Sequence, residues 1–179
     1  MLSVPDRDLL TPRLRLEPLT VEHAPRLFPV LSDPTIYTYL PGEPPTSVES
    51  LRERYERLQR RVSPSGEERW LNWAVWLEAS GRYAGVMQAT VRRENDALIA
   101  YELGEPFRGA GYATEACEAV LAALASDYSV ERVLAYVDTR NLASIRLLER
   151  LGFRRIDRIE NADYFKGAPS DELVYARQR

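Results

Sequence analysis

The stretch Tyr101-Glu-Leu-Gly-Glu-Pro-Phe-Arg-Gly-Ala-Gly-Tyr-Ala-Thr-Glu115 decides how this chain folds. An apolar run from Ala97 leads into it, Gly109 and Gly111 mark a turn, and helical periodicity begins at Ala113. Glycines let backbone N–H groups approach a ligand closely, and a helix N-terminus adds unpaired donors and a positive dipole. The stretch therefore predicts either a site for a diphosphate or only a tight connection between strand and helix.

The turn differs from the two commonest nucleotide-binding loops. It lacks the Gly-Lys-Ser/Thr ending of a P-loop and the third glycine of the dinucleotide fingerprint. After the helix, residues 133–137 form an apolar run of strand length. A strand, a helix and a strand in this order predict two parallel strands with a right-handed crossover.

Outward from this unit, hydrophobic periodicity predicts a mixed α/β (α+β) fold in the order β-α-α-β-β-β-α-β-α-β-β. Strands are expected at residues 13–19, 71–77, 82–92, 97–103, 133–137, 153–159 and 173–176, and helices at 20–31, 46–61, 113–128 and 142–151. Thr20 and the capping box Thr46-x-x-Glu49 supply the first two N-caps, and Pro25 and Pro29 are expected to distort the first helix. Gly152 is expected to end the last helix in a left-handed cap.

Length and composition predict one domain, residues 1–179. A monomer or a homodimer is expected. The chain contains 24 Lys and Arg and 27 Asp and Glu, and the resulting net charge of −3 disfavours nucleic acid as a partner. A single cysteine, Cys117, and a single histidine, His23, disfavour a metal site and a Ser-His-Asp triad. No signal-peptide pattern opens the chain and no stretch has the length of a membrane span, so a cytoplasmic protein without a membrane partner is expected.

Three ordered motifs resemble one known family. Arg108-x-x-Gly111-x-Ala113 matches the Q/R-x-x-G-x-G/A signature of the GCN5-related N-acetyltransferases (GNAT). Tyr112-Ala-Thr-Glu-Ala116 is similar to the branch that contains the ribosomal-protein N-terminal acetyltransferases (RimJ/RimL-like). Residues 11–16 (TPRLRL), 141–144 (NLAS) and 147–153 (LLERLGF) resemble the same branch, so the resemblance covers roughly residues 11–175.

The resemblance implies a strongly twisted mixed sheet and direct transfer of an acetyl group from acetyl-CoA, a co-substrate, to a primary amine on a protein N-terminus or a small molecule, without a metal. It also implies the residues of the donor site. The pyrophosphate would be held by the backbone of Arg108, Gly109, Ala110, Gly111, Tyr112 and Ala113, and the pantetheine arm by the backbone of Glu102, Leu103 and Gly104 together with the Asn141 side chain. Ser144 would lie near the thioester sulfur.

The motifs do not specify which residues act as the acid and the base. Many relatives carry a tyrosine acid seven residues after the position of Asn141, but this chain has Leu148 there, which leaves Ser144 to orient the sulfur. Glu102 and Asp163 compete as the base. An α-amino group, with a reference pKa of about 7.7 to 8.0, is also partly neutral without a base.

Each of these residues also has a simpler structural interpretation. Asn141 and Ser144 are good helix caps, Glu102 fits a solvated strand, and Asp163 fits a loop or turn. A CoA-binding sensor or scaffold without catalysis is therefore the alternative function, and a site for another diphosphate nucleotide is a third.

The acceptor is not encoded in any of these motifs. A basic acceptor would favour a carboxylate-lined cleft, for which Glu43, Glu94 and Asp163 are candidates. Among other conspicuous side chains, Trp73 and Cys117 are expected in the core and His23 at a helix cap or the surface.

Overall fold

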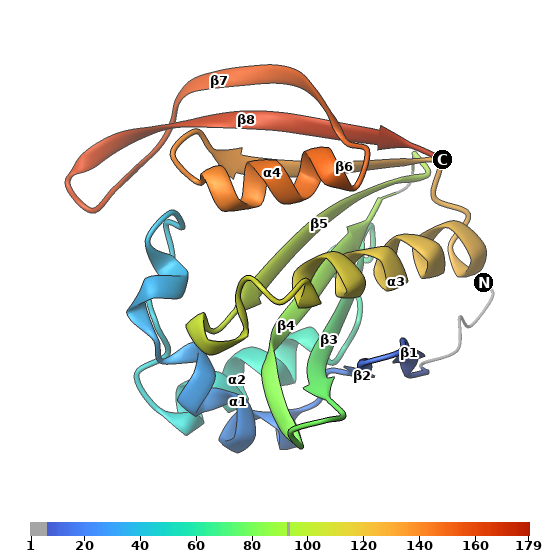
Figure 1. Cartoon of the computed structure of the whole chain (residues 1–179), viewed down its shortest axis with the longest axis vertical. Coiled ribbons are helices and arrows are strands. Elements are labelled where there is room, and N and C mark those ends of the chain that lie inside the picture. Colours follow the sequence, from blue (N-terminus) through green and yellow to red (C-terminus); the bar gives the residue numbers. More distant parts are fainter. Residues whose placement is uncertain (1–6, 93) are drawn as a thin grey trace.

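The computed structural model describes residues 7–92 and 94–179, and within them an eight-stranded sheet is flanked by four α-helices (Figure 1). Residues 1–6, on which the absence of a signal peptide partly depends, lie outside the described residues. The strands are β1 (Leu9–Leu10), β2 (Leu14–Pro18), β3 (Arg69–Leu77), β4 (Arg82–Val91), β5 (Asp96–Leu103), β6 (Arg132–Asp138), β7 (Arg154–Phe165) and β8 (Ala168–Gln178). The helices are α1 (Ala24–Leu31), α2 (Val48–Leu58), α3 (Tyr112–Asp127) and α4 (Leu142–Arg150), with the 3-10 turns η1 (Val21–His23), η2 (Pro34–Tyr37) and η3 (Glu105–Phe107).

The sheet is mixed, with the order β1-β2-β3-β4-β5-β6-β8-β7. β5 and β6 are parallel, as predicted for the strand-helix-strand unit, whereas the other described neighbours are antiparallel. Their pairing runs from Asp96↔Arg132 to Leu98↔Leu134 and then stops, although both strands continue. From residue 99 onward β5 therefore has a free edge toward β6.

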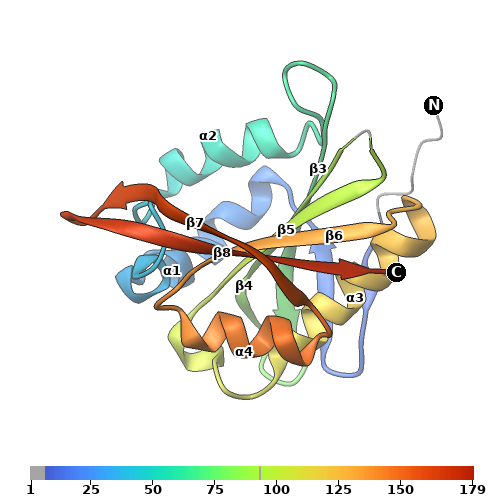
Figure 2. The ribbon, with the colours of Figure 1, turned by 90° about the horizontal axis from the view of Figure 1, so that it is seen from above.

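The two faces of the sheet carry different cores. Buried side chains of α3 and α4, such as Val120 and Leu148, belong to the larger core, and those of α1 and α2, such as Leu27 and Leu51, belong to the smaller one. Figure 2 shows α2 and α4 on opposite sides of the sheet. Because strand side chains alternate between faces, neighbouring residues on β5 reach different helices.

The first two helices begin and end differently from the prediction. Instead of one helix over residues 20–31, a 3-10 turn precedes α1, so Pro25 falls in the first helical turn and only Pro29 is interior. The predicted capping box at Thr46 is wrong, because the cap of α2 is Ser47, whose hydroxyl accepts from the Ser50 amide at 3.0 Å. α2 also ends at Leu58 rather than at residue 61, since the backbone at Arg61 is left-handed, with φ 59°.

The last two strands are much longer than expected. They form a hairpin whose turn, Lys166 and Gly167, has positive φ at both residues, the geometry of a type I′ turn. β7 is exposed along almost its whole length, so no alternation of apolar residues marks it in the sequence. Asp163 consequently lies on a strand and not in the expected loop. Figure 1 shows the hairpin reaching over the splayed end of the sheet toward the segment of η2.

Candidate active site

The turn between β5 and α3 presents a run of free amides. Gly109 and Gly111 have φ of 78° and 83°, which favours glycine, and Gly111 is the N-cap of α3. Among the described residues no acceptor meets the amides from Gly109 to Gly111, and the first helical bond of α3 is Glu115 N to Gly111 O at 3.1 Å. The amides of the first helical turn are unpaired by geometry. The Arg108 amide is bonded to the Glu105 carbonyl at 3.1 Å, so the free run starts one residue later than expected.

A clamp from the connection between β1 and β2 holds this turn. Arg13 Nε lies 2.6 Å from Glu115 Oε2, and Arg13 Nη1 donates to the Ala110 carbonyl at 2.9 Å. Thr11 Oγ1 donates to Glu115 Oε1 at 2.6 Å, and the Arg13 guanidinium lies over the Tyr112 ring, 4.6 Å from its centroid. Burial opposes ionisation of Glu115, but bonds from Thr11 and Arg13 outweigh it and lower its pKa. The two motifs quoted for the branch, far apart in the chain, thus meet at this turn.

Next to this turn, the free edge of β5 faces the gap that opens between β5 and β6 where their pairing stops. Arg108 Nε donates to the Leu103 carbonyl at 3.2 Å, so this carbonyl faces away from β4, and the Leu103 N–H lies on the same side of the extended strand. Gly104 is bonded to β4, through Ala84 O at 3.0 Å. A Cβ at Gly104 would come within 2.8 Å of Val30 Cγ1, so only glycine fits there without movement.

Asn141 and Ser144 open α4 beside this edge. Asn141 is the N-cap, with Oδ1 accepting from the Ser144 amide at 3.2 Å, so the capping interpretation is correct for Asn141 and leaves its Nδ2 free of that role. The Ser144 hydroxyl is instead 2.5 Å from the hydroxyl of Tyr101 on β5. Burial raises the pKa of Tyr101 above its usual value. A tyrosine therefore reaches Ser144 from the strand, whereas Leu148 of α4 is buried in the core.

Tyr101 was missed in the sequence analysis because its role depends on a contact across the gap. Its only local signal is its place beside Glu102 in the deciding stretch. Tyr101 points to α4, so Glu102 points to the opposite face, where Arg54 Nη2 of α2 is 3.6 Å from Glu102 Oε1. The Glu102 side chain is only 12% exposed and its Oε2 is buried without a hydrogen-bond partner among the described residues. It is therefore not the solvated strand carboxylate of the simpler interpretation.

The other carboxylates lie elsewhere. Asp163 is exposed on β7 and accepts from the Tyr164 amide at 2.8 Å, without a described contact to Glu102 or Ser144. Glu94 is exposed in the turn before β5, at the opposite end of this strand from Glu102, and Glu43 is exposed in the loop after η2.

A carboxylate that sequence reasoning missed is Glu172 of β8. Burial raises its pKa, and the charges of Asp163 and Asp138 add to the effect. Asp138, at the end of β6, is itself bonded to Arg140 Nη2 at 2.6 Å and to Ser170 Oγ at 2.6 Å. These groups line the C-terminal half of the sheet but do not reach the free amides.

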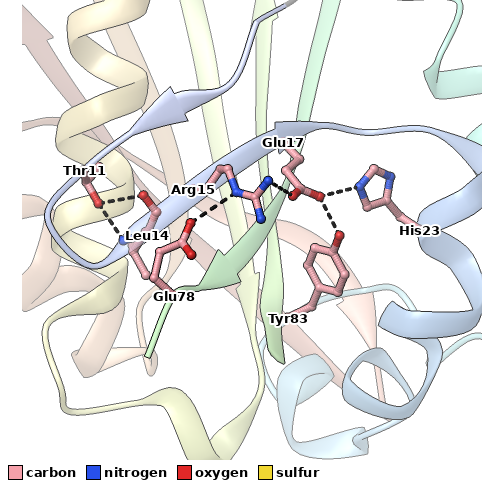
Figure 3. Close-up of polar contacts among 7 residues, drawn as sticks. All are labelled: Thr11, Leu14, Arg15, Glu17, His23, Glu78 and Tyr83. Carbon is pink, nitrogen blue, oxygen red and sulfur yellow. Dashed lines mark hydrogen bonds and ion pairs between the residues drawn. The ribbon is translucent and has the colours of Figure 1, made fainter. Parts of the chain in front are cut away.

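The single histidine belongs to a structural cluster on the N-terminal strand (Figure 3). The Thr20 amide donates to His23 Nδ1 at 3.1 Å, so Nε2 carries the proton and donates to Glu17 Oε2 at 3.0 Å. Tyr83 donates to the same oxygen at 2.5 Å, and Arg15 lies 3.1 Å from the other. His23 therefore caps η1, as expected, and takes no part in the gap between β5 and β6.

The remaining expectations concern core residues and metal. Trp73 and Cys117 are buried, 5% and 0% exposed, as predicted, and burial raises the pKa of the Cys117 thiol to about 12. In the part of the chain that the structure describes, no group of three His, Cys, Asp or Glu side chains is arranged to hold a metal ion. None of the described helices is long and apolar enough to cross a membrane.

Comparison with known proteins identifies the family. A family model for an acetyltransferase (GNAT) domain matches residues 13–154. The chain is 27% identical to the uncharacterized N-acetyltransferase YoaA of Bacillus subtilis and 26% identical to the uncharacterized N-acetyltransferase p20 of Bacillus licheniformis, in each case over 94% of both chains. Its fold resembles that of RimL, a ribosomal L7/L12 alpha-N-protein acetyltransferase solved with coenzyme A, with a TM-score of 0.86 and 22% identity over 96% of this chain and 98% of that one. The chain therefore belongs to the GNAT family of acetyltransferases, enzymes that use acetyl-CoA.

Proposed function

We propose that this enzyme transfers the acetyl group of acetyl-CoA directly to a primary amine in the gap between β5 and β6. One observation carries the proposal: the free amides from Gly109 to the first turn of α3 lie at the end of a strand whose edge is unpaired. The amides suit the diphosphate, and the edge of β5 at Leu103 suits the peptide-like pantetheine arm as an added strand. Of the three residues expected to hold this arm, Gly104 has its amide bonded to β4 instead. Asn141, with its Nδ2 free of the capping bond, donates to the same arm.

The base and the hydroxyl that stabilises the leaving thiolate lie on opposite faces of β5. The amine nitrogen loses a proton to Glu102 Oε2 and attacks the thioester carbonyl carbon, forming the C–N bond, while the Leu103 N–H at the free edge donates to the oxyanion. The C–S bond then breaks, and the Ser144 hydroxyl, which Tyr101 holds, donates a hydrogen bond to the departing CoA sulfur. The acylated nitrogen loses its second proton in this step, and that proton neutralises the CoA thiolate. Tyr101 and Glu102, which are consecutive on β5, thereby act on the leaving thiolate and on the amine, respectively.

Glu102 is favoured over Asp163 as the base because of its surroundings. Arg54 occupies one carboxylate oxygen of Glu102 and the other is unpartnered and buried, whereas Asp163 is exposed and already accepts a backbone N–H. A base must have a free acceptor that points at the substrate. Asp163→Asn is therefore expected to keep most of the activity that Glu102→Gln loses.

The test is an acceptor screen that detects released CoA thiol, together with calorimetry of acetyl-CoA binding. The panel contains small amines, polyamines and peptides with different first residues, which covers protein N-termini and small molecules. We expect one acetyl-CoA per chain and thiol release that requires an amine. Absence of acetyl-CoA binding at saturating concentrations would refute the assignment of the donor site.

A further inference from the structure

Three buried oxygens are left without a hydrogen-bond partner within residues 7–92 and 94–179: the hydroxyls of Tyr37 and Tyr55 and Oε2 of Glu102. Tyr37 and Tyr55 are each only 2% exposed. A buried polar atom without a partner costs about 1–3 kcal/mol, and native proteins satisfy the large majority of such atoms. Their occurrence in one place therefore needs a reason.

The three oxygens come from separate elements but share one environment. Tyr37 ends η2, Tyr55 lies on α2, and Glu102 lies on β5. Burial raises the pKa of Tyr37 to about 12 and also raises that of Tyr55, and in both cases the charge of Glu102 adds to the increase while that of Arg54 opposes it. The charge interaction with Tyr37 raises the pKa of Tyr55 further. The four side chains therefore lie within electrostatic range of one another.

Arg54 determines which part of Glu102 remains available. Its guanidinium approaches Oε1 and leaves Oε2 as the free acceptor. The carbonyl of Tyr37 accepts from Lys166 Nζ at the tip of the β7–β8 hairpin. The cluster of Tyr37, Tyr55, Glu102 and Arg54 thus lies on the face of β5 opposite Ser144. It is bounded by α2 on one side and by the contact with the β7–β8 hairpin on the other.

We propose that the hydroxyls of Tyr37 and Tyr55 and Glu102 Oε2 form the subsite that binds the acceptor nitrogen as a primary ammonium, one N–H donated to each oxygen. This inference rests on the proposed function, because it places the amine on the base side of the thioester. A primary ammonium has three N–H donors, which match three acceptors. A carboxylate ligand would meet the charge of Glu102, and a quaternary ammonium would leave all three oxygens unpaired.

The same arrangement prepares the nitrogen for attack. One N–H bond breaks as an O–H bond forms at Glu102 Oε2, and the neutral amine keeps two N–H bonds to the phenols with its lone pair free. The subsite therefore selects unhindered primary amines over secondary or quaternary ones.

The test measures binding of three small probes to the CoA-loaded enzyme by calorimetry and NMR. The probes are 2-phenylethylammonium, its N,N,N-trimethyl analogue and 3-phenylpropanoate. The double variant Tyr37→Phe, Tyr55→Phe removes only the two hydroxyls, and Tyr83→Phe is the matched control because its hydroxyl binds Glu17 away from the cluster. Since the removed hydroxyls have no partner, the double variant is expected to melt no lower than wild type.

We expect wild type and Tyr83→Phe to bind the primary ammonium and not the other two probes. The double variant and Glu102→Gln should each bind it about ten-fold or more weakly, with unchanged CoA affinity. Equal binding of the trimethyl probe, preference for the carboxylate, unchanged affinity in the double variant, or no ammonium binding to a CoA-loaded enzyme would overturn the inference. If CoA itself does not bind, the proposed function is refuted, and this inference, which rests on it, is refuted as well.

Discussion

At the scale of single residues, the site depends on side chains whose partners are distant in the chain. Ser144 was predicted from its motif, but the hydroxyl that contacts it comes from Tyr101, which the sequence analysis did not select. Asn141 alone provides the side-chain cap of α4, so Ser144 contributes its amide to the cap and its hydroxyl to the gap.

This division of roles predicts separable effects. Ser144→Ala and Tyr101→Phe should each lower kcat about 10- to 100-fold and change acetyl-CoA affinity much less, because a hydrogen bond to the departing sulfur strengthens only as charge develops. Tyr175→Phe is the control, since its hydroxyl also reaches α4, at Glu149, 3.0 Å away. Steady-state rates of thiol release and calorimetry measure the two quantities. Unchanged kcat in both variants would contradict a role of Ser144 and Tyr101 in the chemistry.

Asp138 predicts a dependence of stability on acid pH. Burial opposes its ionisation, but bonds from Arg140 and Ser170 prevail and lower its pKa to about 2, from 3.8. Because the folded pKa is the lower one, its contribution is complete above about pH 4 and is lost as pH falls toward 2. The contribution amounts to about 2 kcal/mol.

Urea unfolding between pH 2 and pH 7 measures this contribution. Asp138→Asn should be less stable than wild type at pH 7, and the difference should shrink toward pH 2. Ser170→Ala, which keeps the carboxylate and the Arg140 bond, should lose only part of it. A difference between wild type and Asp138→Asn that does not vary with pH would show that the carboxylate is not responsible.

At the scale of elements, the turn before α3 is held by the connection between β1 and β2, which is distant in the chain. Glu115 in the first turn of α3 binds Arg13 and Thr11, and Arg13 in turn binds the Ala110 carbonyl. The glycines make the turn possible, whereas the clamp decides where its amides point. Preorganised donors bind better than donors that must first be ordered.

Glu115→Gln is therefore expected to weaken acetyl-CoA binding about 5- to 30-fold, equivalent to about 1–2 kcal/mol. Glu78→Gln is the matched control, because Glu78 also pairs with an arginine, Arg15 of β2, at 3.2 Å, but away from the turn. Calorimetry measures the affinities, and circular dichroism checks that both variants are folded. Equal acetyl-CoA affinities for the two variants would mean that the clamp does not organise the donor site.

At the scale of the whole molecule, the sheet is continuous but opens between β5 and β6. α3 follows β5 and α4 follows β6, so a ligand that contacts the starts of both helices joins the two halves. Such a ligand stabilises only the folded chain.

Saturation with acetyl-CoA should therefore raise the melting temperature, with about 2.7 kcal/mol of stabilisation at a concentration 100 times Kd. Thermal unfolding followed by fluorescence measures the shift, with ATP and NAD at the same concentrations as controls. An equal shift with ATP or NAD would favour the third hypothesis, a site for another diphosphate nucleotide.

Much of the fold could be predicted because its signals are local. The parallel β5 and β6, the helix that starts after Gly111 and the end of α4 at Gly152 depend on hydrophobic period and on residues suited to positive φ. The length of β7 and β8 could not be predicted, since exposed polar strands are held by cross-strand backbone bonds that any sequence can make. The cap of α2 was misplaced by one residue because Thr46 and Ser47 are equally suitable caps.

What the sequence by itself determined is the family motif, the turn with its glycines and the approximate place of the donor site, because short segments specify them through backbone conformation. What only the tertiary structure decided is the surroundings of each functional group. Tyr101 meets Ser144, Arg13 meets Glu115, and Glu102 lies beside Arg54. The physical reason is that these contacts join residues from separate elements, and the packing of helices on the two faces of a splayed sheet, which no local pattern encodes, brings them together.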